Sequence, residues 1–262
     1  MNAYYRQPAI YKDQVVFIAE DDLWTFSLKD EVARRLTANL GMIRNPQFSP
    51  DGKQIAFTST EEGTSEIYIM PSEGGEAKRL TYLGAYLYTL GWKGSKIIFA
   101  SSHSSYLQGY YKLYEIDCEG GAPVELPYGR ATDISFGEKG VVLGRNTGNP
   151  ARWKRYRGGT AGYILIDKNG DGKFKKLIDL KGNFAHPMWI GNRIYFICDH
   201  EGIGNIYSCT PEGKDLQKHS QHKDFYARGA YSDGKNIIWH AGAELWLMDV
   251  KENKPRKLSF AY

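Results

Sequence analysis

The residues with the clearest chemical potential are five basic side chains interleaved with two aromatic rings in one short stretch, 145–160. The basic residues are Arg145, Arg152, Lys154, Arg155 and Arg157, and the rings are Trp153 and Tyr156. Guanidinium and ammonium groups hold carboxylates and phosphates through charge-assisted hydrogen bonds, and aromatic rings stack on guanidinium planes. The stretch therefore predicts a contact with a peptide carboxylate, another anion or a partner domain. The candidate contact residues are Arg152, Lys154, Arg155 and Arg157.

Two other interpretations of this stretch remain open. In the first, the loop packs on a neighbouring domain, with its aromatic rings buried and its cations paired. In the second it binds nucleic acid, which the sequence disfavours because no basic stripe recurs elsewhere. A net charge of +4 over 262 residues is also small for a nucleic-acid partner.

A second candidate is the segment Asp167–Lys173, which begins like a calcium-binding loop. The twelfth position of that loop is Ile178 rather than the bidentate glutamate that a full loop needs, and no helices are expected on either side. A polar turn between two strands explains the segment equally well, so the sequence does not decide whether the turn from Asp167 to Asp171 binds calcium.

The remaining reactive side chains do not form a recognisable site. The six histidines lack metal-ligand spacing: we expect His219 and His222 to be solvated in a polar loop, and His240 to be a core or channel residue. No glycine-flanked nucleophilic serine and no phosphate-binding glycine loop is present. The sequence thus predicts no catalytic residue, no metal site and no cofactor in this chain.

The three cysteines are expected to be reduced core thiols, which fits a reducing compartment. Cys198 and Cys209 are predicted on neighbouring strands joined by a loop from Asp199 to Gly204. Their positions would then be offset by about four residues, or about 13 Å along a strand, which is too far for a disulfide.

The elements that must position these residues follow one pattern, seen most clearly in 45–81. Apolar and β-branched runs alternate with turn signals such as Pro50-Asp51-Gly52 and Gly74-Gly75, which indicates four short antiparallel strands. The second of these strands recurs six times, with aromatic or apolar anchors at Phe17, Phe57, Phe99, Leu143, Phe196 and Trp239. The anchors are spaced by 40, 42, 44, 53 and 43 residues.

A period near forty with four strands per unit is typical of a β-propeller. We therefore predict an all-β, six-bladed β-propeller with four antiparallel strands per blade, closed without strand exchange because no strand is left over at either end. A long β-sandwich is the alternative. The predicted blades of this single domain, 1–262, are approximately 8–40, 41–83, 84–128, 129–180, 181–222 and 223–262. The longest connections, Ser101–Gly109 and Arg145–Thr160, are both predicted between a second and a third strand.

Composition bounds the class of protein. Apolar residues make up 42% of the chain and aromatic residues 14%, enough for a substantial core. The first residues contain no apolar signal-peptide region, and no apolar run approaches the length of a membrane span. We expect a cytoplasmic protein without membrane or nucleic-acid partners.

Several motifs resemble a known family. The unit Ser49–Phe57 is similar to repeats of TolB-type, prolyl-oligopeptidase-type and tricorn propellers. More specific is Trp153–Gly162, which resembles the N-terminal six-bladed propeller of the tricorn protease family. Further similar segments, in the same order along the chain, are Asp21–Trp24, Gly144–Thr147, Arg193–Phe196 and Ile206–Ser208.

The resemblance implies a function for a larger assembly. In that family a seven-bladed propeller and domains with a serine-protease site follow, and hexamers cleave oligopeptides. The catalytic serine and histidine have no counterpart here. The resemblance implies a non-catalytic domain that frames a peptide channel and docks to the other protease domains, within a homo-hexamer. The family's basic pair for the peptide carboxyl terminus matches Leu83–Tyr88, which contains no arginine.

Two other functions remain as alternatives. One is a TolB-like protein-interaction propeller. The other is a stand-alone hydrolase with a metal at the central channel, where Asp133 and His186 lie near suitable positions.

Overall fold

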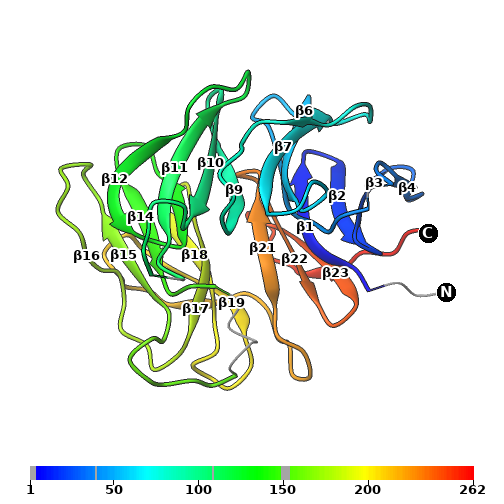
Figure 1. The fold of residues 1–262 in the computed structure, drawn as a ribbon. Coiled ribbons are helices and arrows are strands. Elements are labelled where there is room, and N and C mark those ends of the chain that lie inside the picture. The colour runs from blue at the N-terminus through cyan, green and yellow to red at the C-terminus, as the bar shows by residue number, and fades with distance from the viewer. Residues whose placement is uncertain (1–3, 39, 108, 149–153) are drawn as a thin grey trace. The chain divides into compact units, whose positions relative to one another are not determined.

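The computed structural model describes residues 4–38, 40–107, 109–148 and 154–262, and no helix occurs in these ranges. Twenty-four strands form six four-stranded sheets, and each sheet consists of four antiparallel strands that are consecutive in sequence (Figure 1). This is a six-bladed β-propeller without strand exchange, as predicted. The chain divides into two compact units, one of Met1–Arg130 with Ser259–Tyr262 and one of Ala131–Leu258.

The first unit contains blades one to three. Blade one is β1 (Arg6–Tyr11), β2 (Gln14–Ala19), β3 (Asp22–Ser27) and β4 (Arg34–Arg35). Blade two is β5 (Ile43–Phe48), β6 (Gln54–Ser59), β7 (Glu66–Pro71) and β8 (Lys78–Arg79). Blade three is β9 (Leu87–Lys93), β10 (Lys96–Ser101), β11 (Lys112–Asp117) and β12 (Val124–Arg130).

The second unit contains blades four to six. Blade four is β13 (Asp133–Phe136), β14 (Val141–Arg145), β15 (Tyr163–Asp167) and β16 (Lys175–Lys176). Blade five is β17 (Phe184–Ile190), β18 (Arg193–Cys198), β19 (Asn205–Cys209) and β20 (Gln217–Lys218). Blade six is β21 (Arg228–Ser232), β22 (Asn236–Ala241), β23 (Glu244–Asp249) and β24 (Arg256–Lys257).

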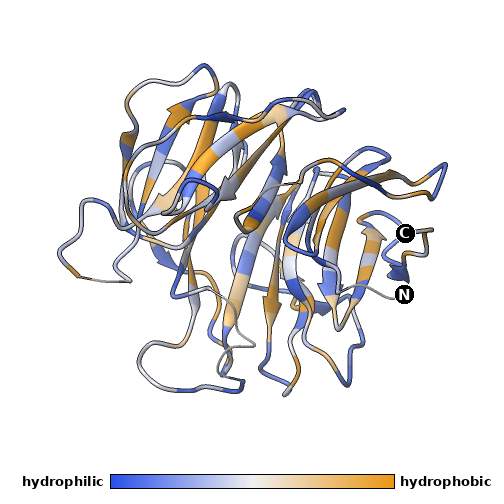
Figure 2. Ribbon diagram, turned by 45° about the vertical axis from the view of Figure 1, so that its right-hand side comes forward, coloured by the Kyte–Doolittle hydropathy of each residue, from blue (hydrophilic) through white to orange (hydrophobic). Residues whose placement is uncertain are grey.

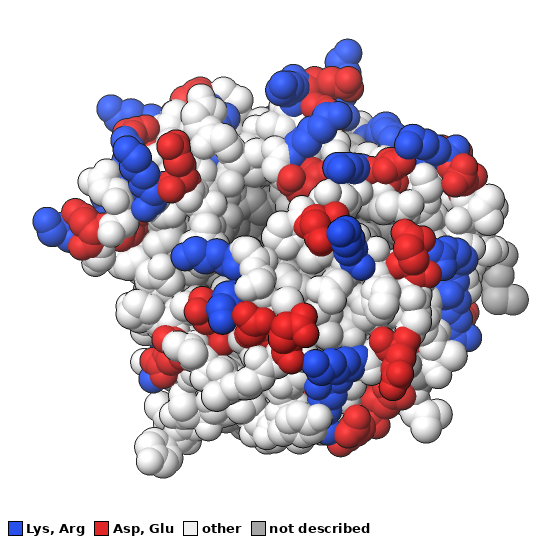
Figure 3. Space-filling view, turned by 90° about the horizontal axis from the view of Figure 1, so that it is seen from above, with Lys and Arg blue, Asp and Glu red and all other residues white. Residues whose placement is uncertain are grey.

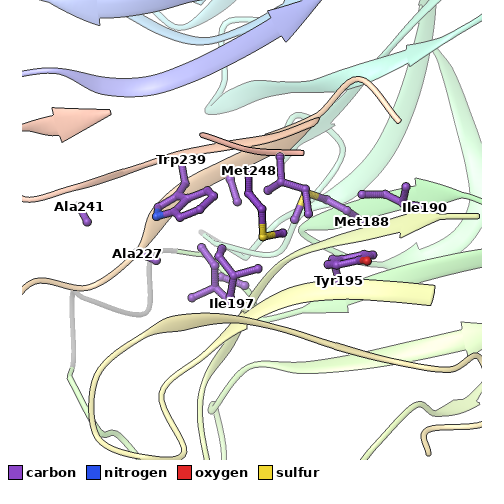
Figure 4. Packing of buried hydrophobic residues seen from close by; sticks show 12 residues of the cluster. Met188, Ile190, Tyr195, Ile197, Ala227, Trp239, Ala241 and Met248 are labelled. Carbon is purple, nitrogen blue, oxygen red and sulfur yellow. The ribbon is translucent and has the colours of Figure 1, made fainter. Parts of the chain in front are cut away.

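The second strands are mostly apolar, and nearly all of their side chains are buried on both faces of the sheet. Val15 to Ala19 of β2 are all fully buried, although successive side chains of a strand point to opposite faces. Figure 2 shows the same apolar colouring in the middle of the sheets. The hydrophobic cores accordingly lie between successive blades. Figure 4 shows one such core, in which Ile197 of blade five packs beside Trp239 and Met248 of blade six.

The turn at Pro50-Asp51-Gly52 has the geometry that its sequence predicts. Gly52 has φ +76°, and its N–H donates to the carbonyl of Ser49 at 2.9 Å. A Cβ at this position would lie 2.2 Å from the ring of Tyr11 in blade one. Glycine is therefore required both by the backbone conformation and by the contact between blades.

The short fourth strands are held by a repeated polar latch. In blade two, Thr81 Oγ1 accepts the N–H of Ile67 at 2.9 Å and donates to buried Glu66 at 2.5 Å. Arg79 approaches the other oxygen of Glu66 at 3.4 Å. Blade one repeats the latch with Asp22, Arg35 and Thr37. In the sequence this latch corresponds to the runs Arg35-Leu36-Thr37 and Arg79-Leu80-Thr81.

The last residues of the chain make a contact that the sequence analysis did not anticipate. Residues 259–262 are left over after β24, and they pack on blade one in the first unit. Ala261 exchanges backbone hydrogen bonds with Glu31 and Ala33, both at 2.8 Å, in a single parallel bridge. The ring of Phe260 stacks on Phe26 with centroids 4.3 Å apart. This segment adds a contact that the repeat pattern does not contain.

The cysteines largely follow the prediction. Cys198 pairs with Asn205 and Cys209 with Ile194, so the two cysteines are offset on neighbouring strands, and all three thiols are free. Burial raises the pKa of Cys198 to about 12 and that of Cys209 to about 11. Cys118 differs because it lies half-buried in the turn after β11.

Candidate functional site

The basic stretch predicted from sequence is the connection between β14 and β15 of blade four, and it is called here the basic loop (145–160). Its first turn is attached to the innermost strand of the same blade. Thr147 Oγ1 donates to Asp133 Oδ2 at 2.5 Å, and the N–H of Thr147 donates to Thr132 Oγ1 at 3.1 Å. The start of the basic loop is therefore fixed to β13.

The end of the basic loop is attached to blade five through Asp199, a fully buried residue directly after β18. Asp199 Oδ2 accepts the backbone N–H of Arg155 at 3.0 Å, and Oδ1 accepts from the guanidinium of Arg157 at 3.2 Å. The N–H of Asn183 also donates to Oδ1 at 2.8 Å. A buried carboxylate needs such partners, and this one gathers them from three segments.

Two further contacts hold the same corner. The hydroxyl of Tyr226 donates to the carbonyl of Gly202 at 2.9 Å and lies 3.4 Å from Asp199 Oδ2. Burial and the nearby Asp199 raise the pKa of Tyr226, so its hydroxyl stays a donor. Arg155 Nε donates to the same Gly202 carbonyl at 3.2 Å. The connection before β21 thus joins blade six to the basic loop.

Three of the four predicted contact residues lie within the described part of the chain, and all three are exposed: Lys154, Arg155 and Arg157. Each also has a partner inside the chain, since the Lys154 ammonium lies 5.8 Å from the ring centre of Tyr226. Arg152 lies outside the described residues. The described ends of the basic loop are therefore bonded to blades four and five and carry solvent-facing positive charge.

Charge elsewhere on the surface is mixed. On the face seen in Figure 3, Lys and Arg lie interspersed with Asp and Glu, and no broad area of one sign is visible. This pattern agrees with the small net charge of +4.

A second polar group lies on the innermost strands of the second unit. Asp133 at the start of β13 and His186 on β17 face each other, with Oδ1 and Nδ1 3.8 Å apart. His186 has φ +47° before Pro187, a strained conformation that also occurs at Gln7 and Asn45, each again before a proline. The inner strands bulge at these three positions.

Burial shifts the pKa values of this pair in opposite directions. It raises the pKa of Asp133 to about 7, and the hydrogen bond from Thr147 only partly offsets this. Burial and the positive charge of Arg228 lower the pKa of His186 to about 4. At neutral pH the imidazole is therefore uncharged and Asp133 is close to its midpoint.

One cluster has the order of groups found in a nucleophile–base–orienter arrangement. Ser208 Oγ lies 2.7 Å from His219 Nε2, and His219 Nδ1 lies 2.6 Å from Asn253 Oδ1. Ser208 is fully buried, however, and its Oγ also accepts from Arg193 Nε at 2.8 Å. A substrate carbonyl has no access to it, so the cluster acts as a structural link between blades five and six.

The expectation that His219 and His222 are solvated in a polar loop is wrong. His219 is buried rather than solvated, and burial lowers its pKa. His222 is half-buried, accepts a hydrogen bond from Trp239 Nε1 at 2.9 Å, and also has a lowered pKa through burial. His240 is buried on β22, as expected of a core residue.

The turn after β15 uses its carboxylate internally. Asp167 Oδ1 accepts the N–H of Gly170 at 2.8 Å, and Oδ2 accepts that of Gly172 at the same distance. Although desolvation opposes it, this set of N–H donors lowers the pKa of Asp167. The geometry is that of a polar turn, in which the first acidic side chain binds backbone amides. Across the described residues, no group of three or more His, Cys, Asp or Glu side chains is placed to hold a metal ion.

Sequence reasoning missed Asp199 and Thr147. The sequence did contain a signal for Asp199. This acidic residue follows the second strand of blade five, and the preceding blade carries a strongly basic loop after its own second strand, so the two charges could have been paired. Thr147 had no such signal, since a threonine in a polar loop is unremarkable until the fold places it beside Asp133.

Comparison with known proteins identifies the family. A model of the tricorn protease N-terminal β-propeller domain matches residues 2–254. The chain belongs to this family. The tricorn-type propeller is 40% identical over 263 residues to "Tricorn protease homolog 1" of Streptomyces coelicolor, a match that covers 98% of this chain and 24% of that protein. It therefore spans about a quarter of the length of this curated relative.

Two further matches bear on the organisation of such proteins. A "Putative Tricorn-like protease N-terminal subunit" of Sulfurisphaera tokodaii is 32% identical over 173 residues, which cover 63% of this chain and 87% of that protein. The crystal structure of the tricorn protease matches the tricorn-type propeller with a TM-score of 0.93 and 34% identity, over 100% of this chain and 27% of that chain.

Similarity to TolB is limited to the fold. The crystal structure of TolB from Acinetobacter baumannii gives a TM-score of 0.67 at 16% identity. Within the described residues, no helix of the tricorn-type propeller is long and apolar enough to cross a membrane.

Proposed function

We propose that this chain is the propeller part of a tricorn-type serine protease, where it guides oligopeptides and holds other domains of the enzyme. The observation that carries this proposal is the match of the whole chain to the tricorn protease structure, with a TM-score of 0.93. The curated relative from Streptomyces coelicolor is about four times longer than the match, which leaves ample chain for a protease domain. Peptide hydrolysis is then a property of those other domains.

The basic loop is the part of the propeller to which we assign the contact. Lys154 and Arg155 are exposed, and their backbone is held to blade five by Asp199. A binding group fixed in advance loses little conformational entropy on binding, so a rigid cationic loop suits a peptide carboxylate or an acidic patch on a partner domain. We assign Arg152 and Arg157 to the same contact surface.

The proposal extends to the assembly and its location. A tricorn-type enzyme built with this propeller would act as a homo-hexamer in the cytoplasm on oligopeptides from protein degradation. The Sulfurisphaera tokodaii relative, named as an N-terminal subunit of a tricorn-like protease, supports the idea that sequences of this type work within a larger protease assembly.

A chimaera tests the proposal directly. The N-terminal propeller of the Streptomyces coelicolor homologue is replaced by this chain, and hydrolysis of fluorogenic oligopeptides and native mass are measured. Four basic residues of the loop are then changed to alanine: Arg152, Lys154, Arg155 and Arg157. We expect at least an approximately fivefold fall in kcat/KM or a loss of assembly.

A matched control changes four exposed lysines elsewhere, in two different units: Lys29, Lys53, Lys173 and Lys235. This variant carries the same loss of positive charge, and we expect it to behave as the unmodified chimaera. Equal peptide hydrolysis and equal assembly in the loop variant and the control would refute the proposed role of the basic loop.

A further inference from the structure

The second long connection, between β10 and β11 of blade three, has an unusual composition. The sequence contains no Lys, Arg, Asp or Glu from 80 to 92 and none from 97 to 111, although 24% of the chain is charged. These two stretches hold six of the nineteen tyrosines. They include the connection before β9 and the connection between β10 and β11, so both loops at this end of blade three are uncharged.

The two loops are joined to each other. The N–H of Ser102 donates to the carbonyl of Tyr86 at 3.0 Å, and Ser102 Oγ lies 3.3 Å from the same oxygen. Tyr88 and Tyr111, one from each stretch, form an edge-to-face pair with ring centres 5.4 Å apart. Burial and, to a smaller extent, Tyr86 raise the pKa of Tyr111.

The outer part of this region presents large side chains to solvent. Tyr86 is 62% exposed, Tyr106 is fully exposed and Leu107 is 67% exposed. We call Tyr86, Tyr106 and Leu107, together with the partly buried Tyr88 and Tyr111, the tyrosine surface. Isolated exposed apolar residues are common, but a group of this size on one pair of loops indicates an interaction site.

The tyrosine surface is held in shape before any partner arrives. Ser104 Oγ bonds the hydroxyl of Tyr114 on β11 at 2.5 Å. The N–H of Tyr110 donates to the carbonyl of Leu107 at 3.1 Å, which closes a turn within the loop. Tyrosine supplies a large amphipathic contact with only two side-chain torsions to fix, so such a surface binds at low entropic cost.

The absence of charge on the tyrosine surface restricts the kind of partner that can bind there. The charged groups nearest to this end of blade three already have partners in the chain, since Lys112 pairs with Glu125 at 2.8 Å and the Arg130 guanidinium lies 5.5 Å from the ring centre of Tyr110. The exposed part offers ring faces and hydroxyls without a net charge. This complements an uncharged segment, whereas an acidic or basic segment would lose hydration without gaining a counter-charge.

We propose that the tyrosine surface binds extended oligopeptide segments rich in proline and other apolar residues. Such segments present flat apolar faces and free backbone carbonyls, which match aromatic rings and tyrosine hydroxyls. The inference rests on the proposed function, because peptides are the molecules that such a propeller would meet. It assigns to blade three a task that differs from that of the basic loop, which contacts carboxylates.

Fluorescence polarisation with capped peptides tests this inference on the intact chain. A nine-residue peptide of alternating proline and leucine, amidated at its carboxyl end and labelled with an uncharged fluorophore, carries no carboxylate for the basic loop. We expect saturable binding of this probe and at least an approximately tenfold weaker Kd for the triple variant Tyr86→Ala, Tyr106→Ala and Leu107→Ala. A peptide of alternating serine and glutamate should not bind.

Two control variants keep the test sharp. Phe225→Ala removes an equally exposed ring (62%) from the other unit, and its Kd should stay within about twofold of the parent. The double variant Tyr86→Phe and Tyr106→Phe keeps the rings and should retain most of the binding, and circular dichroism of each variant confirms folding. No saturable binding by the parent chain, equal binding by the triple variant, or equal binding of the acidic peptide would each overturn the inference.

Failure here is distinguishable from failure of the proposed function. If the triple variant binds the capped peptide normally but prevents assembly of the chimaera, the tyrosine surface docks a protease domain and the inference is wrong, while the proposed function stands. If the basic-loop variant alone impairs the chimaera and capped peptides never bind, the same conclusion follows.

Discussion

The long loops of blades three and four connect the same pair of strands but are held by different parts of the molecule. The blade-three loop is attached to its own blade, because Ser104 bonds Tyr114 on β11. The basic loop of blade four is attached to the next blade, because Asp199 after β18 accepts from Arg155 and Arg157. One loop is uncharged with exposed rings, and the other is basic and is bonded to Asp199 at Arg155 and Arg157.

The difference depends on which type of residue in the third strand pairs with the anchor of the second strand. In blades two and five the equivalent third-strand tyrosine also bonds its own loop, through Tyr68 to Glu62 at 3.3 Å and Tyr207 to Glu201 at 2.9 Å. In blade four the residue paired with the anchor Leu143 is Leu165, which has no hydroxyl. Blade four therefore lacks this tyrosine attachment: Thr147 bonds the start of its loop to Asp133 of β13, and Asp199 of blade five holds the later part of the loop.

The largest expected effect on stability comes from breaking the link between the basic loop and blade five. Asp199→Ala removes a buried carboxylate that accepts from the guanidinium of Arg157 and from the backbone N–H groups of Arg155 and Asn183. We expect a loss of about 4 kcal/mol in the free energy of unfolding, measured by urea denaturation. The control Asp215→Ala removes an exposed carboxylate that pairs with Arg193 and should cost less than about 1 kcal/mol. Similar losses for both variants would show that the bonds to Asp199 contribute no more to the free energy of unfolding than an exposed ion pair does.

The second effect concerns pH at the start of the basic loop. Between pH 4 and about 6.5 the folded chain keeps the proton on Asp133 that the unfolded chain releases, so this residue lowers stability as pH rises. His186 does the opposite, because the folded chain holds it uncharged while the unfolded chain binds a proton. The two slopes oppose each other in the parent chain.

Variants separate the two slopes. Relative to the parent, Asp133→Asn should gain about 3 kcal/mol of stability between pH 4 and pH 7, because the opposing contribution of the carboxyl is gone. His186→Asn should instead lose stability relative to the parent as pH rises from 4 to about 6.5, because the favourable contribution of the uncharged imidazole is gone. Thermal denaturation across this range measures both, and parallel curves for parent and variants would contradict the burial of the pair.

The smallest effect concerns the attachment of each loop to its own blade. Tyr114→Phe removes one hydroxyl and should cost about 1 kcal/mol, as should Tyr207→Phe in blade five. The exposed Tyr82 (73%) provides the control, since Tyr82→Phe should leave stability within about 0.5 kcal/mol.

Limited proteolysis sharpens the comparison further. Tyr114→Phe should speed chymotrypsin cleavage near Tyr106 and leave trypsin cleavage at Lys154 and Arg155 unchanged, whereas Asp199→Ala should do the reverse. Cleavage that rises at both loops in either variant would mean that the two attachments are not independent.

The sequence predicts the blades well because their signals are local and repeated. The anchor run at Val15–Phe17 and the turn at Pro50-Asp51-Gly52 need no partner from elsewhere to be recognised. Contacts between blades are different, since Asp199 and Arg157 lie 42 residues apart and only the fold brings them together. The same holds for buried His219, whose surroundings look polar in sequence but are supplied by Ser208 and Asn253.

The contact of residues 259–262 with blade one has a consequence for synthesis. Blade one leaves the ribosome first, yet its aromatic cluster of Tyr5, Phe17 and Phe26 receives Phe260 only when translation reaches the far end of this sequence. The earliest blade to emerge is thus among the last to gain its full set of neighbours. A nascent chain stalled at residue 258 would carry all six sheets in sequence and still leave that cluster open to water.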